Sequence, residues 1–190
     1  VTFVASSWNF AVLLLAMILM VINKFLAPQR SYAIMTLLFQ NGGGEKTIRE
    51  SNLFFNFVSL IILTSFIMLF SMFIQRFYLI YGGNYILHDG VDFFMDIVFV
   101  IVTMIIFNYL LTSLYSWLFK SEEMLLLHVS SVVSLMSLAV MILIPSILLL
   151  LFYPYKFVYV ITLTLLLILF IIRLIKLLIE VRMLSKLNFV

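Results

Sequence analysis

Long runs of apolar residues, separated by short polar segments, make up most of the chain. A helix needs about 20 largely apolar residues to cross the hydrocarbon core of a bilayer. Five runs are on that scale, covering residues 1–22, 53–74, 97–119, 124–152 and 157–172. They are apolar on every face, whereas a barrel strand would alternate apolar and polar residues. The pattern predicts an all-α, polytopic transmembrane bundle of about five helices, within a single domain, residues 1–190.

Two of these runs predict departures from a simple crossing helix. The fourth run is long enough to need tilt, and Pro145 within it lacks a backbone N–H and therefore favours a bend. The fifth run is followed by charged residues at near-helical spacing, so we expect this helix to leave the membrane as an amphipathic cytoplasmic extension. These charged residues are Arg173, Lys176, Glu180, Arg182 and Lys186.

The polar segment after the first run contains a short amphipathic stretch, residues 31–39. Such a stretch suits a helix that lies in the membrane interface. The breaker Asn41-Gly42-Gly43-Gly44 follows it directly. We therefore expect a short interfacial helix after the first crossing helix.

The charges between the runs predict the orientation of the bundle. Five crossings place nine of the 11 Lys and Arg residues on one face: Lys24, Arg30, Lys46, Arg49, Lys120, Arg173, Lys176, Arg182 and Lys186. The opposite face has only Arg76 and Lys156, and its loop over residues 77–94 is acidic and turn-rich. Because basic residues concentrate on the cytoplasmic side, we expect an N-out/C-in orientation.

The composition excludes several classes of protein. Hydrophobic residues make up 66% of the chain and charged residues 10%, whereas a soluble domain is about 45–50% apolar and about 25% charged. A disordered chain, a disulfide-rich secreted domain and a soluble enzyme are therefore excluded. The chain has no Cys, which removes thiolate metal sites and Cys nucleophiles.

Ionisable residues at membrane depth are the usual sign of transport or catalysis, because they are costly to keep there. Asp96 is the transport candidate, as an ion or proton site near the outer end of the third run. The alternative is an interfacial residue at the start of a helix, where the positive end of the helix dipole favours a carboxylate.

Weakly polar residues recur at helical spacing in the third and fourth runs. They are Asn108, Thr112 and Ser116 in the third run, and Ser130, Ser134 and Ser137 in the fourth. Small and weakly polar residues allow transmembrane helices to approach closely and to form hydrogen bonds across the contact. We interpret both stripes as helix-packing surfaces, and a substrate pathway is the alternative.

The two histidines do not form a pattern that predicts catalysis or metal binding. His88 lies in a loop and His128 near the start of the fourth run, without the converging ligands that a metal site needs. A serine hydrolase would need a base on the same helix surface, which His128 and Ser130 do not provide. We therefore predict no catalytic residue, no metal site and no cofactor, and expect that the protein is not an enzyme.

The most informative group of charges is expected at the inner face. Its members are Arg49, Glu50, Glu122, Glu123, Arg173 and Lys176. Placed at one membrane level, they would form an ion network or a rim for docking a partner. The alternative is a set of solvated interfacial charges, in which each pair contributes about 0–1 kcal/mol.

Several segments near these charges resemble a domain-of-unknown-function family of multi-pass inner-membrane proteins from Bacteroidota. The similar segments are Leu37-Leu38-Phe39-Gln40, Ile48-Arg49-Glu50-Ser51-Asn52-Leu53-Phe54, Leu118-Phe119-Lys120-Ser121-Glu122-Glu123, Ile172-Arg173-Leu174 and Arg182-Met183-Leu184. The glycines after Asn41 depart from the family pattern, and the family's last hydrophobic helix would begin near Phe189. The resemblance implies an inner-membrane location and no known enzymatic activity.

These observations favour a non-catalytic integral subunit or scaffold of a larger inner-membrane complex. An envelope machine of Bacteroidota for protein secretion and gliding is one candidate, and an accessory role in a respiratory complex is another. The alternative from a different class is a small transporter or channel. The expected partners are the lipid bilayer and other integral membrane proteins, without nucleic acid.

Overall fold

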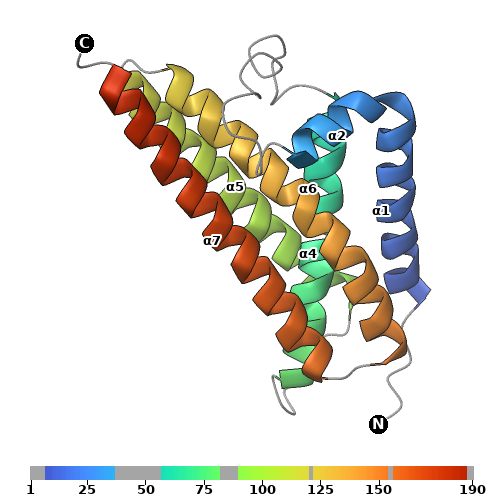
Figure 1. Ribbon diagram of the computed structural model, residues 1–190. Helices are drawn as coiled ribbons and strands as arrows, with labels where there is room; N and C mark the ends of the chain where they lie inside the picture. The colour runs from blue at the N-terminus through green and yellow to red at the C-terminus, as the bar shows by residue number, and fades with distance from the viewer. Residues whose placement is uncertain (1–6, 37–56, 82–89, 120–121, 154–155, 188–190) are drawn as a thin grey trace.

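The computed structural model describes residues 7–36, 57–81, 90–119, 122–153 and 156–187. At positions 7, 119, 122–127 and 180–187 it describes only the backbone. The described residues form helices and no strands (Figure 1). The helices are α1 (Ser7–Leu26), α2 (Pro28–Thr36), α4 (Phe57–Tyr81), α5 (Val91–Phe119), α6 (Glu122–Phe152) and α7 (Lys156–Leu187).

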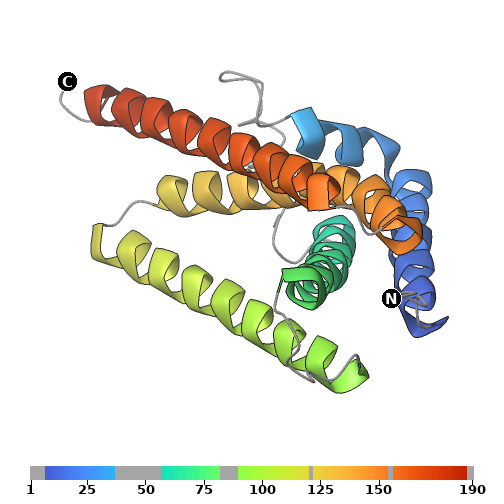
Figure 2. The same cartoon turned by 90° about the horizontal axis from the view of Figure 1, so that it is seen from below.

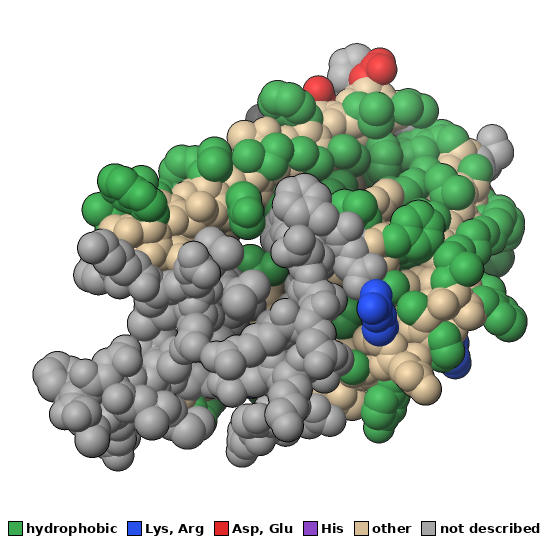
Figure 3. Space-filling view, turned by 90° about the horizontal axis from the view of Figure 1, so that it is seen from above, with side chains coloured by type: hydrophobic (Ala, Val, Ile, Leu, Met, Phe, Trp, Pro, Cys, Tyr) green, Lys and Arg blue, Asp and Glu red, His purple; other side chains and the backbone are tan. Residues whose placement is uncertain are grey.

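Five of these helices, all except α2, are long and apolar enough to cross a membrane. This confirms the prediction of an all-α chain with five long apolar helices, and the protein is therefore a multi-pass membrane protein. The surface agrees with this conclusion, since apolar side chains cover most of the described area in Figure 3 and charged side chains are few. Helix α6 is continuous through Pro145, so the proline does not interrupt the helix.

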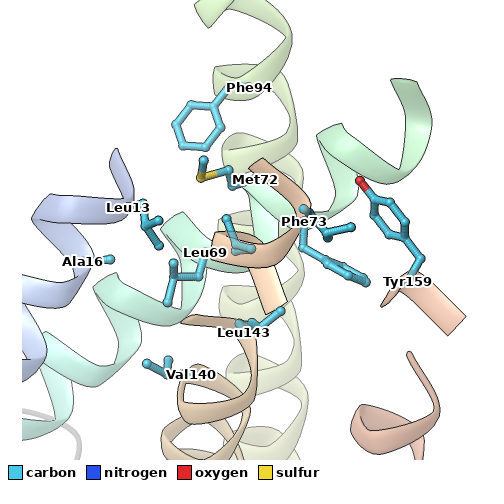
Figure 4. Packing of buried hydrophobic residues seen from close by; sticks show 11 residues of the cluster. Leu13, Ala16, Leu69, Met72, Phe73, Phe94, Val140, Leu143 and Tyr159 are labelled. Atoms are coloured by element: carbon cyan, nitrogen blue, oxygen red, sulfur yellow. The ribbon is translucent and has the colours of Figure 1, made fainter. Parts of the chain in front are cut away.

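The core lies where α4 and α6 pack together, with α1 and α7 against them. Leu69 of α4 and Leu143 of α6 are fully buried in this core, beside Leu13 of α1 and Tyr159 of α7 (Figure 4). Phe94 of α5 belongs to the same cluster, so side chains from five helices form one apolar centre. In lipid, such packing stabilises the bundle through dispersion contacts, because lipid tails are as apolar as the core itself.

Helix α5 stands at the margin of the bundle. Figure 2 shows α5 on one side and α7 on the opposite side, with α6 between them. Phe94 and Ile101 are the only described residues of α5 that are buried. Large apolar side chains elsewhere on α5 are strongly exposed, including Phe99 at 72% and Trp117 at 76%.

The loop between α4 and α5 is shorter than the sequence predicted, because both helices extend into it. Helix α4 continues to Tyr81 and α5 begins at Val91. The extra turn of α4 packs on the start of α7, where the rings of Phe77 and Tyr81 lie 5.9 and 6.2 Å from the ring of Tyr159, centroid to centroid. These aromatic contacts keep the segment helical until the two glycines that follow it.

The short helix α2 follows α1 after a single residue and packs against α6. Pro28 occupies its first position, where the missing backbone N–H costs nothing. Ser31 and Ile34 are buried, and the Ser31 hydroxyl donates to the Asn23 carbonyl oxygen over 3.4 Å. A short helix therefore exists where the amphipathic stretch begins. The expected stretch beyond Thr36 lies outside the described residues.

Candidate functional site

Polar side chains from α5, α6 and α7 meet in one group, which we name the three-helix polar cluster. Its members are Asn108 of α5, His128 and Ser131 of α6, and Arg173 of α7. The Nε2 atom of His128 lies 3.1 Å from Oδ1 of Asn108 and 3.5 Å from an Nη atom of Arg173. Arg173 also donates from Nε to the Ser131 hydroxyl over 3.3 Å. One guanidinium thus joins α7 to α6, and one imidazole joins α6 to α5.

Helix geometry explains why these residues meet. His128 and Ser131 are three positions apart, so both side chains lie on the same face of α6. Arg173 reaches them from α7 along its flexible apolar stem. All members lie within helix segments that are apolar enough to span a membrane. The cluster therefore places a guanidinium and an imidazole within the spanning segments, which is costly unless they are hydrogen-bonded.

The tautomer of His128 decides which of its contacts is a hydrogen bond. A protonated Nε2 donates to Oδ1 of Asn108, and it then has no lone pair for Arg173. An unprotonated Nε2 accepts from Arg173 instead, and because its single lone pair is then used, Oδ1 of Asn108 receives no hydrogen bond from His128. Since Asn108 is exposed while Arg173 and His128 are half-buried, the amide is free to rotate. The cluster can thus exchange between two hydrogen-bonding patterns without moving a helix.

The predicted inner-face charges are only partly described. Arg49 and Glu50 lie outside the described residues, and Glu122 and Glu123 begin α6 with their backbone alone described. Arg173 belongs to the three-helix polar cluster rather than to a carboxylate pair. Lys176 is half-buried one turn further along α7 and has an interaction of its own. The predicted network or docking rim stays a prediction.

The predicted packing stripes differ in their surroundings. In α6, Ser130, Ser134 and Ser137 are all buried, at 5%, 0% and 0% exposure. In α5, Asn108 bonds across to α6, while Thr112 donates to the Asn108 carbonyl oxygen of its own helix. Ser116 is half-buried and takes part in a further interaction.

Asp96 lies in the second turn of α5, where its side chain is exposed. It is therefore not part of the three-helix polar cluster. The described residues contain no group of three His, Cys, Asp or Glu side chains that is placed to hold a metal ion. The prediction of no metal site concerns the whole chain and stays a prediction.

His128 and Ser131 were not predicted as site residues, although the sequence contains a signal for them. Their segment is apolar enough to be a membrane span, and ionisable groups in such segments need polar partners. Arg173 was assigned to the end of the fifth run, whereas the apolar segment of α7 continues to Ile179. An Arg173 within the spanning segment needs a polar partner, and His128 is a residue of a suitable type.

Comparison with known proteins places the chain in a family. Residues 9–190 match the family model described as "Domain of unknown function (DUF4271)". The chain belongs to the DUF4271 family. Membership in DUF4271 agrees with the resemblance to a domain-of-unknown-function family, and it covers nearly the whole chain. No curated protein and no solved structure matches the chain significantly.

Proposed function

We propose that this protein is a non-catalytic integral subunit or scaffold of a larger membrane complex, and that α5 contacts a partner membrane protein. The one-sided packing of α5 supports the proposal, because Phe94 and Ile101 are its only described residues that are buried. A helix that belongs to a bundle normally buries a continuous stripe against its neighbours. A partner helix against α5 would complete that stripe.

The side chains on the exposed part of α5 also support this proposal. Met104 and Phe107 are 70% and 62% exposed, and Trp117 is 76% exposed. Aromatic residues and Met are enriched in protein–protein interfaces. The large contact area of the aromatic rings and the flexibility of the Met side chain favour contact with a second protein over contact with lipid alone.

The finer assignments rest on charge distribution and family resemblance. We propose an inner-membrane location in Bacteroidota, an N-out/C-in orientation and an interfacial position for α2. The proposed complex is an envelope machine for secretion and gliding. A respiratory complex is the second candidate for the same role.

Native purification of the tagged, full-length protein in mild detergent tests the subunit proposal. We expect a complex of fixed stoichiometry that loses its partner in the double variant Met104→Ala/Phe107→Ala. The matched control is Phe10→Ala/Leu14→Ala, which truncates side chains on α1 that are 51% and 46% exposed. A wild-type protein that runs alone as a monomer would overturn the proposal, as would equal partner loss in both double variants.

The three-helix polar cluster favours a second candidate function, a small transporter or channel. An imidazole that switches hydrogen-bond partners beside a guanidinium is a plausible relay for protons. Flux through liposomes that contain the purified protein would test this candidate. Transport that disappears in His128→Asn or in Asp96→Asn would support it, and the absence of flux with the wild-type protein would exclude it.

A further inference from the structure

Arg76 is a buried cation, and two of its three guanidinium nitrogens have no hydrogen-bond partner among the described residues. It lies near the end of α4 and is 5% exposed. Its Nε and Nη2 atoms are buried, and neither forms a hydrogen bond in the described structure. The described carboxylates nearest in sequence, Asp92 and Asp96, are both exposed. A guanidinium within a membrane-spanning helix needs an anion to balance its charge and to accept its N–H groups.

The side chains around Arg76 also favour an anion. The Tyr159 hydroxyl is buried without a hydrogen-bond partner, and it is close enough to Arg76 for an electrostatic interaction. The Tyr159 ring lies against Phe73 in the core, with 5.5 Å between ring centroids (Figure 4). The Tyr81 ring lies 6.2 Å from it, and the Lys156 ammonium is 5.4 Å from the Tyr81 centroid. Arg76 and an unused hydroxyl donor are thus close together, and the Lys156 ammonium lies near them, over the Tyr81 ring.

The first turn of α7 contributes further positive potential. Lys156 is the first residue of this helix and Tyr159 lies in its first turn. The N-terminal end of a helix carries a partial positive charge and backbone N–H groups without helical partners. The positive end of the α7 dipole, the Lys156 ammonium and the Arg76 guanidinium thus lie at the same end of the bundle (Figure 1).

The level of this site in the bundle indicates the kind of anion. Arg76 lies five residues before the end of the α4 span at Tyr81, which is about 8 Å along the helix axis. Tyr159 lies at the very start of the α7 span. Both residues are therefore close to the boundary of the hydrocarbon core, where lipid phosphates lie.

We propose that Arg76, Tyr159 and Lys156 bind a phosphate group, carried by an anionic phospholipid or present as free phosphate. The planar guanidinium donates two parallel hydrogen bonds to two phosphate oxygens. The Tyr159 hydroxyl donates to a third oxygen, and the Lys156 ammonium balances the remaining charge. Tyr81 and Lys156 are exposed, so the site adjoins the outside of the bundle at these two residues. With a lipid, the acyl chains lie along exposed apolar residues of α7 such as Phe157 and Val160.

Native mass spectrometry of the full-length protein in detergent tests this site. One sample receives equimolar phosphatidylglycerol and phosphatidylcholine, and a second receives inorganic phosphate alone. We expect selective retention of phosphatidylglycerol, reduced by about tenfold or more in Arg76→Gln because charge-assisted hydrogen bonds are lost. Tyr159→Phe keeps the packed ring, and Lys156→Gln changes an exposed side chain. Both therefore test the site if Arg76→Gln does not fold.

Two variants are matched controls. Arg173→Gln removes the other guanidinium within a spanning segment, and Lys24→Gln removes an exposed ammonium from α1. Neither should alter phosphatidylglycerol retention. Retention of inorganic phosphate that depends on Arg76 and Tyr159 would support the site with the free anion as its ligand. Equal retention of both lipids, or phosphatidylglycerol retention unchanged in Tyr159→Phe and Lys156→Gln, would overturn the proposal.

Discussion

Asn108 is the residue that connects α5 to the polar interior of the bundle. Its side chain reaches His128 of α6, although α5 buries few of its own residues. In a membrane, where apolar contacts with protein and with lipid are similar, a single polar contact of this kind can position a helix. The role of Asn108 can therefore be tested by removing the amide alone.

Asn108→Leu keeps a side chain of similar size but removes the contact with His128. We expect it to lower the free energy of unfolding by about 0.5–2 kcal/mol, the range for hydrogen bonds between transmembrane helices. Reversible unfolding in mixed micelles measures this difference. Thr112→Val is the control, because the Thr112 hydroxyl bonds within α5. Equal losses in both variants would contradict an interhelical role for Asn108.

The members of the three-helix polar cluster show which part of a site sequence reasoning can find. Asn108 was recognised as a packing residue within the third run, and Arg173 as a charge at the end of the fifth run. Their shared contact with His128 depends on how three helices are rotated about their axes. Periodicity within one helix contains no information on the rotation of its neighbours, so the cluster could not be predicted as a unit.

At the scale of helices, α4 and α6 pack against each other, and both contain fully buried serines. Ser134 and Ser137 of α6 are fully buried, and so are Ser65 and Ser71 of α4. The hydroxyl oxygens of all four serines are buried without hydrogen-bond partners in the described structure. Their contribution to the contact is therefore small size, which allows the helices to approach closely.

Ser134 provides a direct test of this close approach. Ser134→Leu places a large side chain where no space exists, so we expect a loss of about 1–3 kcal/mol in the free energy of unfolding. Ser134→Ala keeps the small size and should be nearly neutral. Unfolding in mixed micelles again supplies the measurement. If the alanine variant were destabilised as much as the leucine variant, the hydroxyl rather than the size of Ser134 would be important.

The five long helices were predictable because hydropathy is a local property of the chain. Three of their ends were less predictable: α4 continues to Tyr81, α5 begins at Val91 and α1 continues to Leu26. Tertiary contacts determine where these helices begin or end. Tyr81 packs on Tyr159 at the end of α4, and Asn23 is buried at 1% exposure near the end of α1. The small-residue face of α6 was visible in the sequence. The buried serines of α4, Ser65 and Ser71, were not recognised because they are six positions apart and do not recur at helical spacing.

The whole molecule has a compact half and an open half. Helices α1, α4 and α6 share the core with the start of α7 and with Phe94 of α5, whereas most of α5 and most of α7 present apolar side chains outward. In an 18-residue apolar stretch of α5 and in one of α7, 6% and 11% of the residues are buried, against 50% in the corresponding stretches of α4 and α6. A partner protein would therefore bury more exposed residues by contacting the open half than by contacting the compact half.

The distribution of basic residues over the two ends of the bundle leads to a prediction about orientation. The end of α1, with Lys24, and the start of α7, with Lys156, lie at opposite ends (Figure 1). Because the chain has no Cys, a single introduced Cys reports on one position alone. In spheroplasts, which are cells with an intact inner membrane, a membrane-impermeant maleimide should label Lys156→Cys directly and Lys24→Cys only after permeabilisation, as the positive-inside rule requires.

The cysteine-free wild-type protein provides the background for this labelling experiment. The reverse result, with Lys24→Cys labelled in intact cells, would contradict the N-out/C-in orientation. Labelling of both positions from the same side would contradict the crossings themselves, because α4, α5 and α6 lie between them in the chain. The experiment therefore separates an error in orientation from an error in the number of crossings. It also determines whether the proposed phosphate site of Arg76 lies in the outer leaflet.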